Sequence, residues 1–331
     1  MSILYHALVI QNTSRCNAQC AMCYQSAGPK GSDQIGDHTL DNEVLKRVLT
    51  DALNINTLHR RFHLSGGEAF LNIENAIELF EHAKNIGYEE ITAVTNGFWA
   101  KNKKKGLEVA QKLKNAGVSA LEISWDYWHF EHISSEMVCN CIEVCYETGI
   151  ETNLRLLATR KHTHLESLSH LKSSTLNIVD RIICSHVSPT GRACKTIPKS
   201  ELFFDKNISS TCYHSLNLTV NANGYVYPCC SGFDQTENII FGNIYKTPIH
   251  IIAARMNASP LLQTVVLYGI SAFIPILKKN GIEINERNYA DICTLCWSIF
   301  SNKEYVKIIK NYFDETTKRA IEKYYNLKLS N

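Results

Sequence analysis

The chain lacks any strong bias of charge or composition. Its 331 residues carry 34 lysines and arginines against 32 aspartates and glutamates, a formal net charge of +2. So small a net charge gives no field that would attract nucleic acid or a membrane surface, and we expect neither as a partner. With 45% apolar and 20% charged residues, no repeat and no low-complexity linker, the sequence indicates an ordinary globular protein.

Segments that would direct the chain to a membrane are also missing. The first ten residues contain no basic stretch and no cleavage site, so they do not form a signal peptide. Residues 261–277 are strongly apolar, but they are few for a membrane span and include Gln263, Gly269 and Pro275. A buried pair of helices is the better interpretation. We therefore expect a cytoplasmic protein.

Cysteine, by contrast, is abundant, with 13 residues. Without export, structural disulfides are not expected, and metal or thiol chemistry becomes the default interpretation. Cys16, Cys20 and Cys23 form a C-x3-C-x2-C loop. Three thiolates can hold three irons of a [4Fe–4S] cluster and leave the fourth open to bind and activate a ligand. The alternative is a zinc knuckle, although knuckles usually pair their ligands as C-x2-C.

The order of apolar runs predicts an α/β fold. Short apolar runs alternate with amphipathic segments up to about residue 194, which indicates parallel βαβ units with right-handed crossovers. The pattern suits a (β/α)6 partial TIM barrel, with the active-site groups at the carboxyl ends of the strands. The expected strands are residues 7–11, 62–65, 91–95, 120–124, 153–158 and 182–187, and the expected helices are 41–54, 73–86, 103–116, 135–148 and 163–173.

After residue 195 the alternation stops. We therefore expect two domains, the partial barrel at residues 1–197 and a smaller domain at residues 198–331. The second domain begins with a loop-rich, cysteine-bearing stretch at 200–242, continues with a helical region at 251–280, and ends with a polar amphipathic helix from about 303 to 325.

Polar motifs follow the predicted strands. In Leu64-Ser-Gly-Gly-Glu68, two glycines let the backbone approach a ligand closely, and the carboxylate can accept hydrogen bonds from an ammonium. The third strand ends in Thr95-Asn-Gly97 and the fourth in Ile123-Ser-Trp-Asp126, which can also be explained as turns. Residues 125–132 are rich in aromatic and imidazole side chains, which fits either a peptide-binding cleft or a packed loop.

The cysteine loop resembles the signature of radical S-adenosylmethionine (SAM) enzymes, and the Gly-Gly-Glu that follows about forty residues later resembles the motif that holds the SAM amino group. The resemblance implies that SAM occupies the open iron. It also implies that Ser124 and Asp126 bond the ribose and that Arg155 approaches the SAM carboxylate. The implied SAM-binding residues are Tyr24, Ser65, Gly66, Gly67, Glu68, Asn96, Ser124, Asp126 and Arg155.

The later cysteines resemble the SPASM auxiliary-cluster domain of peptide-modifying radical SAM enzymes, in its shortened "twitch" form. The resemblance implies one closed [4Fe–4S] cluster, which suits electron transfer or structural support. A structural zinc ion on the same side chains is the alternative. The implied ligands are Cys212, Cys229, Cys293 and Cys296.

Other cysteines are not needed as ligands. Cys230 stands beside a predicted ligand, and a free thiol there is a good hydrogen-atom donor to a carbon radical because its S–H bond is comparatively weak. Cys230 can also pack in the core or replace Cys229 as the ligand. We predict that five further cysteines are buried as small hydrophobic residues. These are Cys139, Cys141, Cys145, Cys184 and Cys194.

Four phrases look specifically like the epimerases that mature epipeptides. The resemblance implies conversion of L- to D-residues in a ribosomal precursor peptide, with Cys230 as the catalytic hydrogen donor and a flavodoxin or ferredoxin as electron donor. The rival interpretations are a radical SAM enzyme that cross-links peptides and a non-catalytic zinc-binding scaffold. The phrases are Ser-Gly-Gly-Glu-Ala-Phe-Leu71, Asn-Gly-Phe-Trp99, Ile-Ser-Trp-Asp-Tyr-Trp-His129 and Tyr-Pro-Cys-Cys230.

Overall fold

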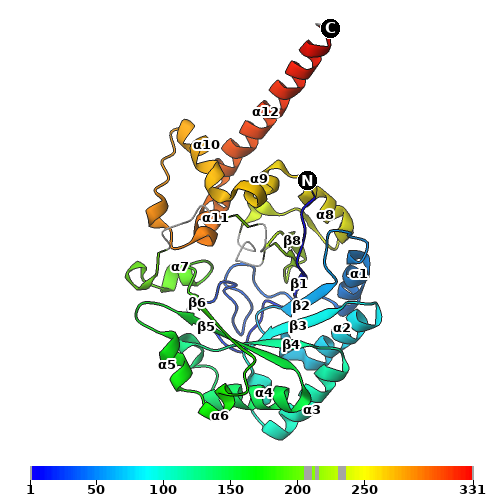
Figure 1. The fold of residues 1–331 in the computed structure, drawn as a ribbon, viewed down its shortest axis with the longest axis vertical. Helices are drawn as coiled ribbons and strands as arrows, with labels where there is room; N and C mark the ends of the chain where they lie inside the picture. The colour runs from blue at the N-terminus through cyan, green and yellow to red at the C-terminus, as the bar shows by residue number, and fades with distance from the viewer. Residues whose placement is uncertain (1, 205–210, 213–215, 230–235, 330–331) are drawn as a thin grey trace.

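A computed structural model describes residues 2–204, 211–212, 216–229 and 236–329, without the side chains of residue 237 and residues 320–329. One nine-stranded sheet runs through them in the order β6-β5-β4-β3-β2-β1-β7-β8-β9 (Figure 1). Its strands are β1 (Leu8–Gln11), β2 (Arg61–Ser65), β3 (Glu90–Thr95), β4 (Ala120–Ser124), β5 (Glu151–Ala158), β6 (Arg181–His186), β7 (Leu218–Val220), β8 (Tyr225–Tyr227) and β9 (Gly242–Asn243).

The first six strands confirm the predicted partial barrel. Each neighbouring pair from β1 to β6 is parallel, and helices connect successive strands from β1 onward. The sheet does not end there, because β7 pairs in parallel with β1 and then continues into the antiparallel strands β8 and β9. Hydrogen bonding is thus continuous across the expected domain boundary after residue 197, and that boundary stays a prediction.

Helices cover the outer face of the barrel strands, and a second group gathers at one end of the molecule (Figure 1). Side-chain caps fix the starts of several of them, as where Asp41 accepts hydrogen bonds from two first-turn amides of α1. The helices are α1 (Asn42–Ala52), α2 (Ile73–Asn85), α3 (Lys103–Asn115), α4 (Ser135–Thr148), α5 (His164–Ser169), α6 (Ser173–Leu176), α7 (Ala193–Thr196), α8 (Ile249–Ala258), α9 (Pro260–Tyr268), α10 (Ile274–Lys279), α11 (Ile292–Ser301) and α12 (Lys303–Leu329).

One predicted helix is wrong in its second half. The segment 163–173 ends as a helix at Ser169, and α6 begins only at Ser173. The Ser169 hydroxyl donates a hydrogen bond to the carbonyl of Glu166 (2.7 Å), which competes with the backbone ladder at that point.

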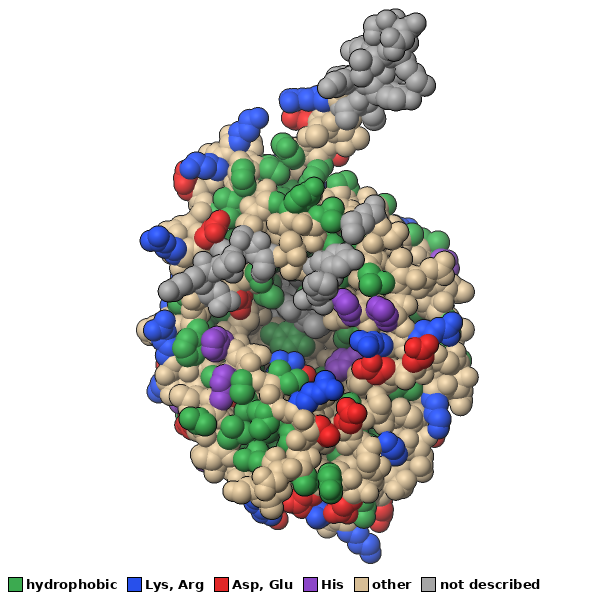
Figure 2. All heavy atoms as spheres, in the orientation of Figure 1, with side chains coloured by type: hydrophobic (Ala, Val, Ile, Leu, Met, Phe, Trp, Pro, Cys, Tyr) green, Lys and Arg blue, Asp and Glu red, His purple; other side chains and the backbone are tan. Residues whose placement is uncertain are grey.

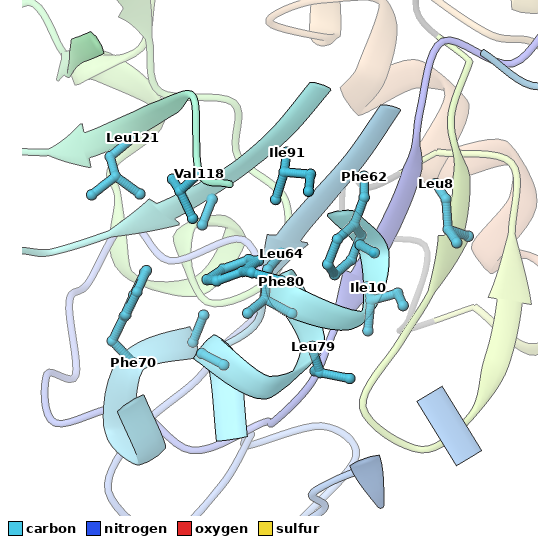
Figure 3. Packing of buried hydrophobic residues seen from close by; sticks show 14 of the residues in the cluster. Leu8, Ile10, Phe62, Leu64, Phe70, Leu79, Phe80, Ile91, Val118 and Leu121 are labelled. Atoms are coloured by element: carbon cyan, nitrogen blue, oxygen red, sulfur yellow. The ribbon is translucent and has the colours of Figure 1, made fainter. Parts of the chain in front are cut away.

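The main core lies between the sheet and its covering helices. Alternate strand residues such as Phe62, Leu64 and Leu121 are fully buried in one cluster (Figure 3), where the ring of Phe62 packs against that of Phe80 of α2. Burial of each such side chain contributes about 1.5–3 kcal/mol. The intervening residues are only partly buried, with a strict alternation along β5, so they face the interior of the partial barrel.

The C-terminal helices have a smaller core of their own, formed by α9, α10, α11 and the first turns of α12 around Phe273 and Phe300. The apolar segment 261–277 is therefore the predicted buried helix pair, α9 and α10. The distal part of α12 projects away from the body (Figure 1). Across the residues that the structure describes, no helix combines the length and apolar character needed to cross a membrane.

The expectation for the spare cysteines is confirmed on α4 and wrong on β6 and α7. Cys139, Cys141 and Cys145 are buried against the sheet. Cys184 and Cys194 are exposed. The reason for Cys184 is that its face of the edge strand β6 is uncovered, since Ile182 and His186 on the same face are exposed too.

Candidate active site

The cysteine loop leaves the carboxyl end of β1 at the centre of the sheet. Cys16 and Cys20 are buried and Cys23 is partly buried. The amide of Ala18 donates to the Cys16 sulfur (3.4 Å), and the amides of Gln25 and Ala27 face the Cys23 sulfur. Amides aimed at sulfur stabilise thiolates, which are the form that binds iron. The donor set therefore fits a [4Fe–4S] cluster.

The two glycines after β2 pack against this loop. The Gly67 amide donates to the Thr13 carbonyl (2.7 Å), and a Cβ at Gly67 would lie only 2.1 Å from the Arg15 carbonyl oxygen. At Gly66 the φ of +149° and a contact of 2.8 Å with Asn12 Oδ1 also exclude a side chain. In the structure, the two glycines let the backbone after β2 approach the backbone that leads into the cysteine loop.

Glu68 is buried directly behind this packing, with 2% of its surface exposed. Its carboxylate accepts hydrogen bonds from the amides of Phe70 (3.1 Å) and Asn96 (2.8 Å) and from the Thr95 hydroxyl (2.9 Å). Burial raises the pKa of Glu68 to about 7 despite these bonds. The carboxylate therefore ties the end of β3 to the Gly-Gly turn and is poised between its two protonation states near neutrality.

Asn96 extends this connection to the cluster cysteines. Its side-chain amide donates to Asn17 Oδ1 (2.9 Å) and lies 3.9 Å from the Cys16 sulfur. Ser65 is buried, and its carbonyl accepts from the Asn12 amide (3.1 Å). The ends of β2 and β3 are thus both attached to the loop that carries the three cysteines.

The end of β4 reaches the same loop through His129, a residue for which the sequence analysis gave no role. Asp126, 1% exposed, accepts a hydrogen bond from His129 Nδ1 (2.8 Å), and His129 in turn contacts Cys20. Burial opposes a charge on His129, but Asp126 and Cys20 outweigh it and raise its pKa well above the usual value. The Asp-x-x-His spacing at a strand end was the available signal.

Three other residues predicted to bind SAM make their own contacts within the protein. Arg155 donates to Glu122 Oε2 (2.9 Å) and to the Ser185 hydroxyl (3.1 Å) inside the barrel. Ser124 is the register partner of Arg155 and is partly buried at the end of β4. The Tyr24 hydroxyl accepts from the side chain of Gln25 (3.1 Å). Their SAM contacts stay predictions.

The aromatic segment after β4 is mostly packed. Trp125 is 1% exposed and donates its indole N–H to the Ser167 carbonyl (2.9 Å). Tyr127 is exposed, with its ring stacked on His162 at 3.4 Å between centroids, and Glu131 and His132 at the end of the segment are exposed too. Figure 2 shows a hollow in the middle of one face of the molecule, with histidine side chains on both sides of it.

The second cysteine set also comes together. Cys296 of α11 is buried, and burial together with the nearby charges of Cys212, Cys229 and Cys293 raises its pKa. Cys230 lies outside the described residues.

Comparisons with known families cover both cysteine sites. Residues 10–171 match the model of the radical SAM superfamily, and residues 212–297 match SPASM, an iron–sulfur cluster-binding domain. The first of these domains binds a [4Fe–4S] cluster and SAM, and the second binds further iron–sulfur clusters.

Individual proteins resemble the chain to different extents. The chain is 27% identical to a putative peptide biosynthesis protein, YydG of Bacillus subtilis, over 95% of each chain. A probable GTP 3′,8-cyclase of Methanocaldococcus jannaschii is 28% identical over only 36% of each chain. Among solved structures, native anSMEcpe with bound AdoMet has a TM-score of 0.57 at 16% identity, over 96% of this chain and 98% of that one. This last likeness concerns the fold alone.

Proposed function

Because the chain belongs to the radical SAM superfamily and carries a SPASM domain, we propose that it is a peptide-modifying enzyme that converts L- to D-residues in a ribosomally made precursor peptide. Its likeness to a peptide biosynthesis protein along 95% of the chain supports a peptide substrate. The likeness to GTP cyclases covers only about a third of the chain. A cytoplasmic location and a flavodoxin or ferredoxin as electron donor are parts of the same proposal.

One observation carries epimerisation in particular. Cys212, Cys229, Cys293 and Cys296 lie close enough for their charges to interact, which supports them as the four ligands of one closed cluster. Cys230 is then left over, adjacent in sequence to a ligand. An enzyme that must return a hydrogen atom to a carbon radical needs a thiol that is not bound to iron.

The proposed roles divide between the two sites. Cys16, Cys20 and Cys23 would hold a [4Fe–4S] cluster that, reduced by one electron from the external donor, would cleave SAM to methionine and a 5′-deoxyadenosyl radical, which would take the Cα hydrogen of a peptide residue and leave as 5′-deoxyadenosine. Cys230 then donates a hydrogen atom to the opposite face of that carbon, and the new C–H bond inverts the centre. One electron from the external donor and one proton from water restore the thiol. Glu68 and Asn96 orient the SAM amino group beside the cysteine loop.

The test is anaerobic incubation of the reconstituted enzyme with SAM, dithionite as the reductant and a candidate precursor peptide in D2O. Epimerisation makes the peptide one mass unit heavier, with a D-residue found by chiral analysis after hydrolysis. A product lighter by two hydrogens would instead establish cross-linking, the rival reaction.

A matched pair of variants separates Cys230 from its neighbour. Cys230→Ala is expected to abolish the D-product while SAM cleavage continues, whereas Cys229→Ala is expected to lose the auxiliary iron. Unchanged D-product in Cys230→Ala would refute the donor role. A colourless, zinc-loaded protein after anaerobic purification would support the non-catalytic scaffold.

A further inference from the structure

The segment that follows β6 holds the cysteine loop through one buried arginine. Arg192 is 8% exposed, and its Nη1 donates to the carbonyl of Cys20 (2.9 Å). Its Nη2 donates to the carbonyls of Ser26 (2.7 Å) and Ala27 (2.9 Å). Its Nε pairs with Asp33 Oδ2 at 2.8 Å. The guanidinium thus reaches across more than 160 residues of sequence to bind both sides of the loop.

The contact with Ser26 determines where an amide points. The Ser26 carbonyl and the Ala27 amide belong to one peptide unit, and in a trans peptide these two groups point in opposite directions. Because Arg192 holds the carbonyl on its own side, the amide is directed to the other side, where it faces the Cys23 sulfur. The arginine therefore sets the direction of an N–H···S hydrogen bond at a cluster ligand.

The backbone at Ser26 needs such support. Ser26 has a φ of +55°, the only positive value at a non-glycine residue in the described part of the chain, and it is fully buried. A non-glycine residue adopts the left-handed region only at a cost in free energy, so surrounding contacts must enforce it. Bonds from Arg192 Nη2 and from the Asp33 amide (3.0 Å) to its carbonyl do so here.

Other residues of the segment 191–196 also contact carbonyl groups of the cysteine loop. The Arg192 amide donates to the Cys23 carbonyl (3.0 Å), and the Thr196 hydroxyl donates to the Ala21 carbonyl (2.7 Å). Gly191, at a φ of +59°, lies so close to Tyr24 that a Cβ would be 2.0 Å from its carbonyl oxygen. Carbonyl oxygens of the loop are thus turned toward residues 191–196, which leaves its amides available to the sulfurs.

We propose that Arg192 is a positioning residue for the [4Fe–4S] cluster of the radical SAM domain. It holds the carbonyls of the cysteine loop away from the cluster, so that the loop presents N–H groups to the cluster sulfurs. Its buried positive charge also stabilises the extra electron of the reduced cluster. This role belongs to the family's cluster and does not depend on whether the reaction is epimerisation or cross-linking.

The experiment compares R192K, R192Q and the control R160Q. Arg160 also bonds a backbone carbonyl, that of Leu202 (2.9 Å), and its hydrogen bonds among the described residues reach residues 201 and 202 rather than the cysteine loop. After anaerobic reconstitution we would follow iron release to a chelator and titrate the reduced clusters by electron paramagnetic resonance. The auxiliary cluster in the same chain serves as an internal reference for folding.

For R192Q, we expect the SAM-cluster iron to leave about tenfold faster than in the wild type, because charge-assisted bonds to three carbonyls are lost. The midpoint potential of that cluster should fall, while the auxiliary signal is unchanged. R192K keeps the positive charge but lacks the several N–H donors of the guanidinium. It should therefore keep the midpoint potential of the wild type but lose iron faster. R160Q should match the wild type.

Two outcomes would overturn the proposal. In the first, R192Q retains its iron and its midpoint potential at wild-type values. In the second, R192Q loses both clusters at the same rate together with its secondary structure, which would make Arg192 a residue of general folding. The milder variant D33A separates these cases, since it removes one anchor of the guanidinium and leaves the three carbonyl contacts in place.

Discussion

We predict that Glu68 makes the affinity for SAM depend on pH around neutrality. Its carboxyl group offers a negative charge to the SAM ammonium only when it is ionised, and burial raises its pKa to about 7. A raised carboxyl pKa means that the proton is held below about pH 7. The contribution of Glu68 to SAM binding is therefore present above pH 7 and is lost as the pH falls through this value.

The size of the effect follows from the ionised fraction. With a pKa of about 7, the carboxylate is about nine-tenths ionised at pH 8 and about one-tenth ionised at pH 6. The affinity of the wild type for SAM should thus fall about tenfold between these pH values, which corresponds to about 1.4 kcal/mol. Glu68→Gln has no such proton to lose and should bind SAM more weakly at pH 8.

Isothermal titration of SAM into the anaerobic, cluster-loaded protein measures both variants from pH 6 to pH 8. Titration of the SAM amino group itself affects both proteins equally, so the informative quantity is the ratio of their affinities. A ratio that stays constant across this range would refute the role of Glu68 as the acceptor.

Three further predictions test the packing and the two cysteine sets. Gly67→Ala should lower the free energy of unfolding by about 3 kcal/mol in denaturant titration, because its Cβ would meet the backbone of Arg15. With a thiol reagent on the folded protein, Cys184 should react at once and Cys141 only after unfolding, since one is exposed and the other buried. Cys296→Ala should lose about half of the bound iron and keep the SAM-induced change in the resonance spectrum.

The periodic parts of the fold could be predicted from the sequence, because parallel strands and their covering helices leave a strong apolar pattern. The six barrel strands lie within two residues of their expected bounds. The pattern could not show that β6 is an edge strand, since that depends on which strands pair, and so the exposure of Cys184 was missed.

In the candidate site, too, the features that are local in sequence could be predicted and the long-range contacts could not. Cysteine spacing and Gly-Gly-Glu pointed to residues that the structure brings together, since both are local in sequence. Arg192 is held by contacts with residues far away in sequence, and the sequence around it does not show which carbonyls it binds. The bond between Asp126 and His129 was not expected either, while the contact of Asp126 with a ribose stays a prediction.

The position of β1 has a consequence for the order of assembly on the ribosome. This strand emerges first, yet it is hydrogen-bonded between β2 and β7, and β7 begins only at Leu218. All residues up to Val220 must therefore be synthesised before β1 has both of its neighbours, and such distant pairing forms late. Because the cysteine loop follows β1 directly, we expect iron to be inserted only after β7 has been synthesised.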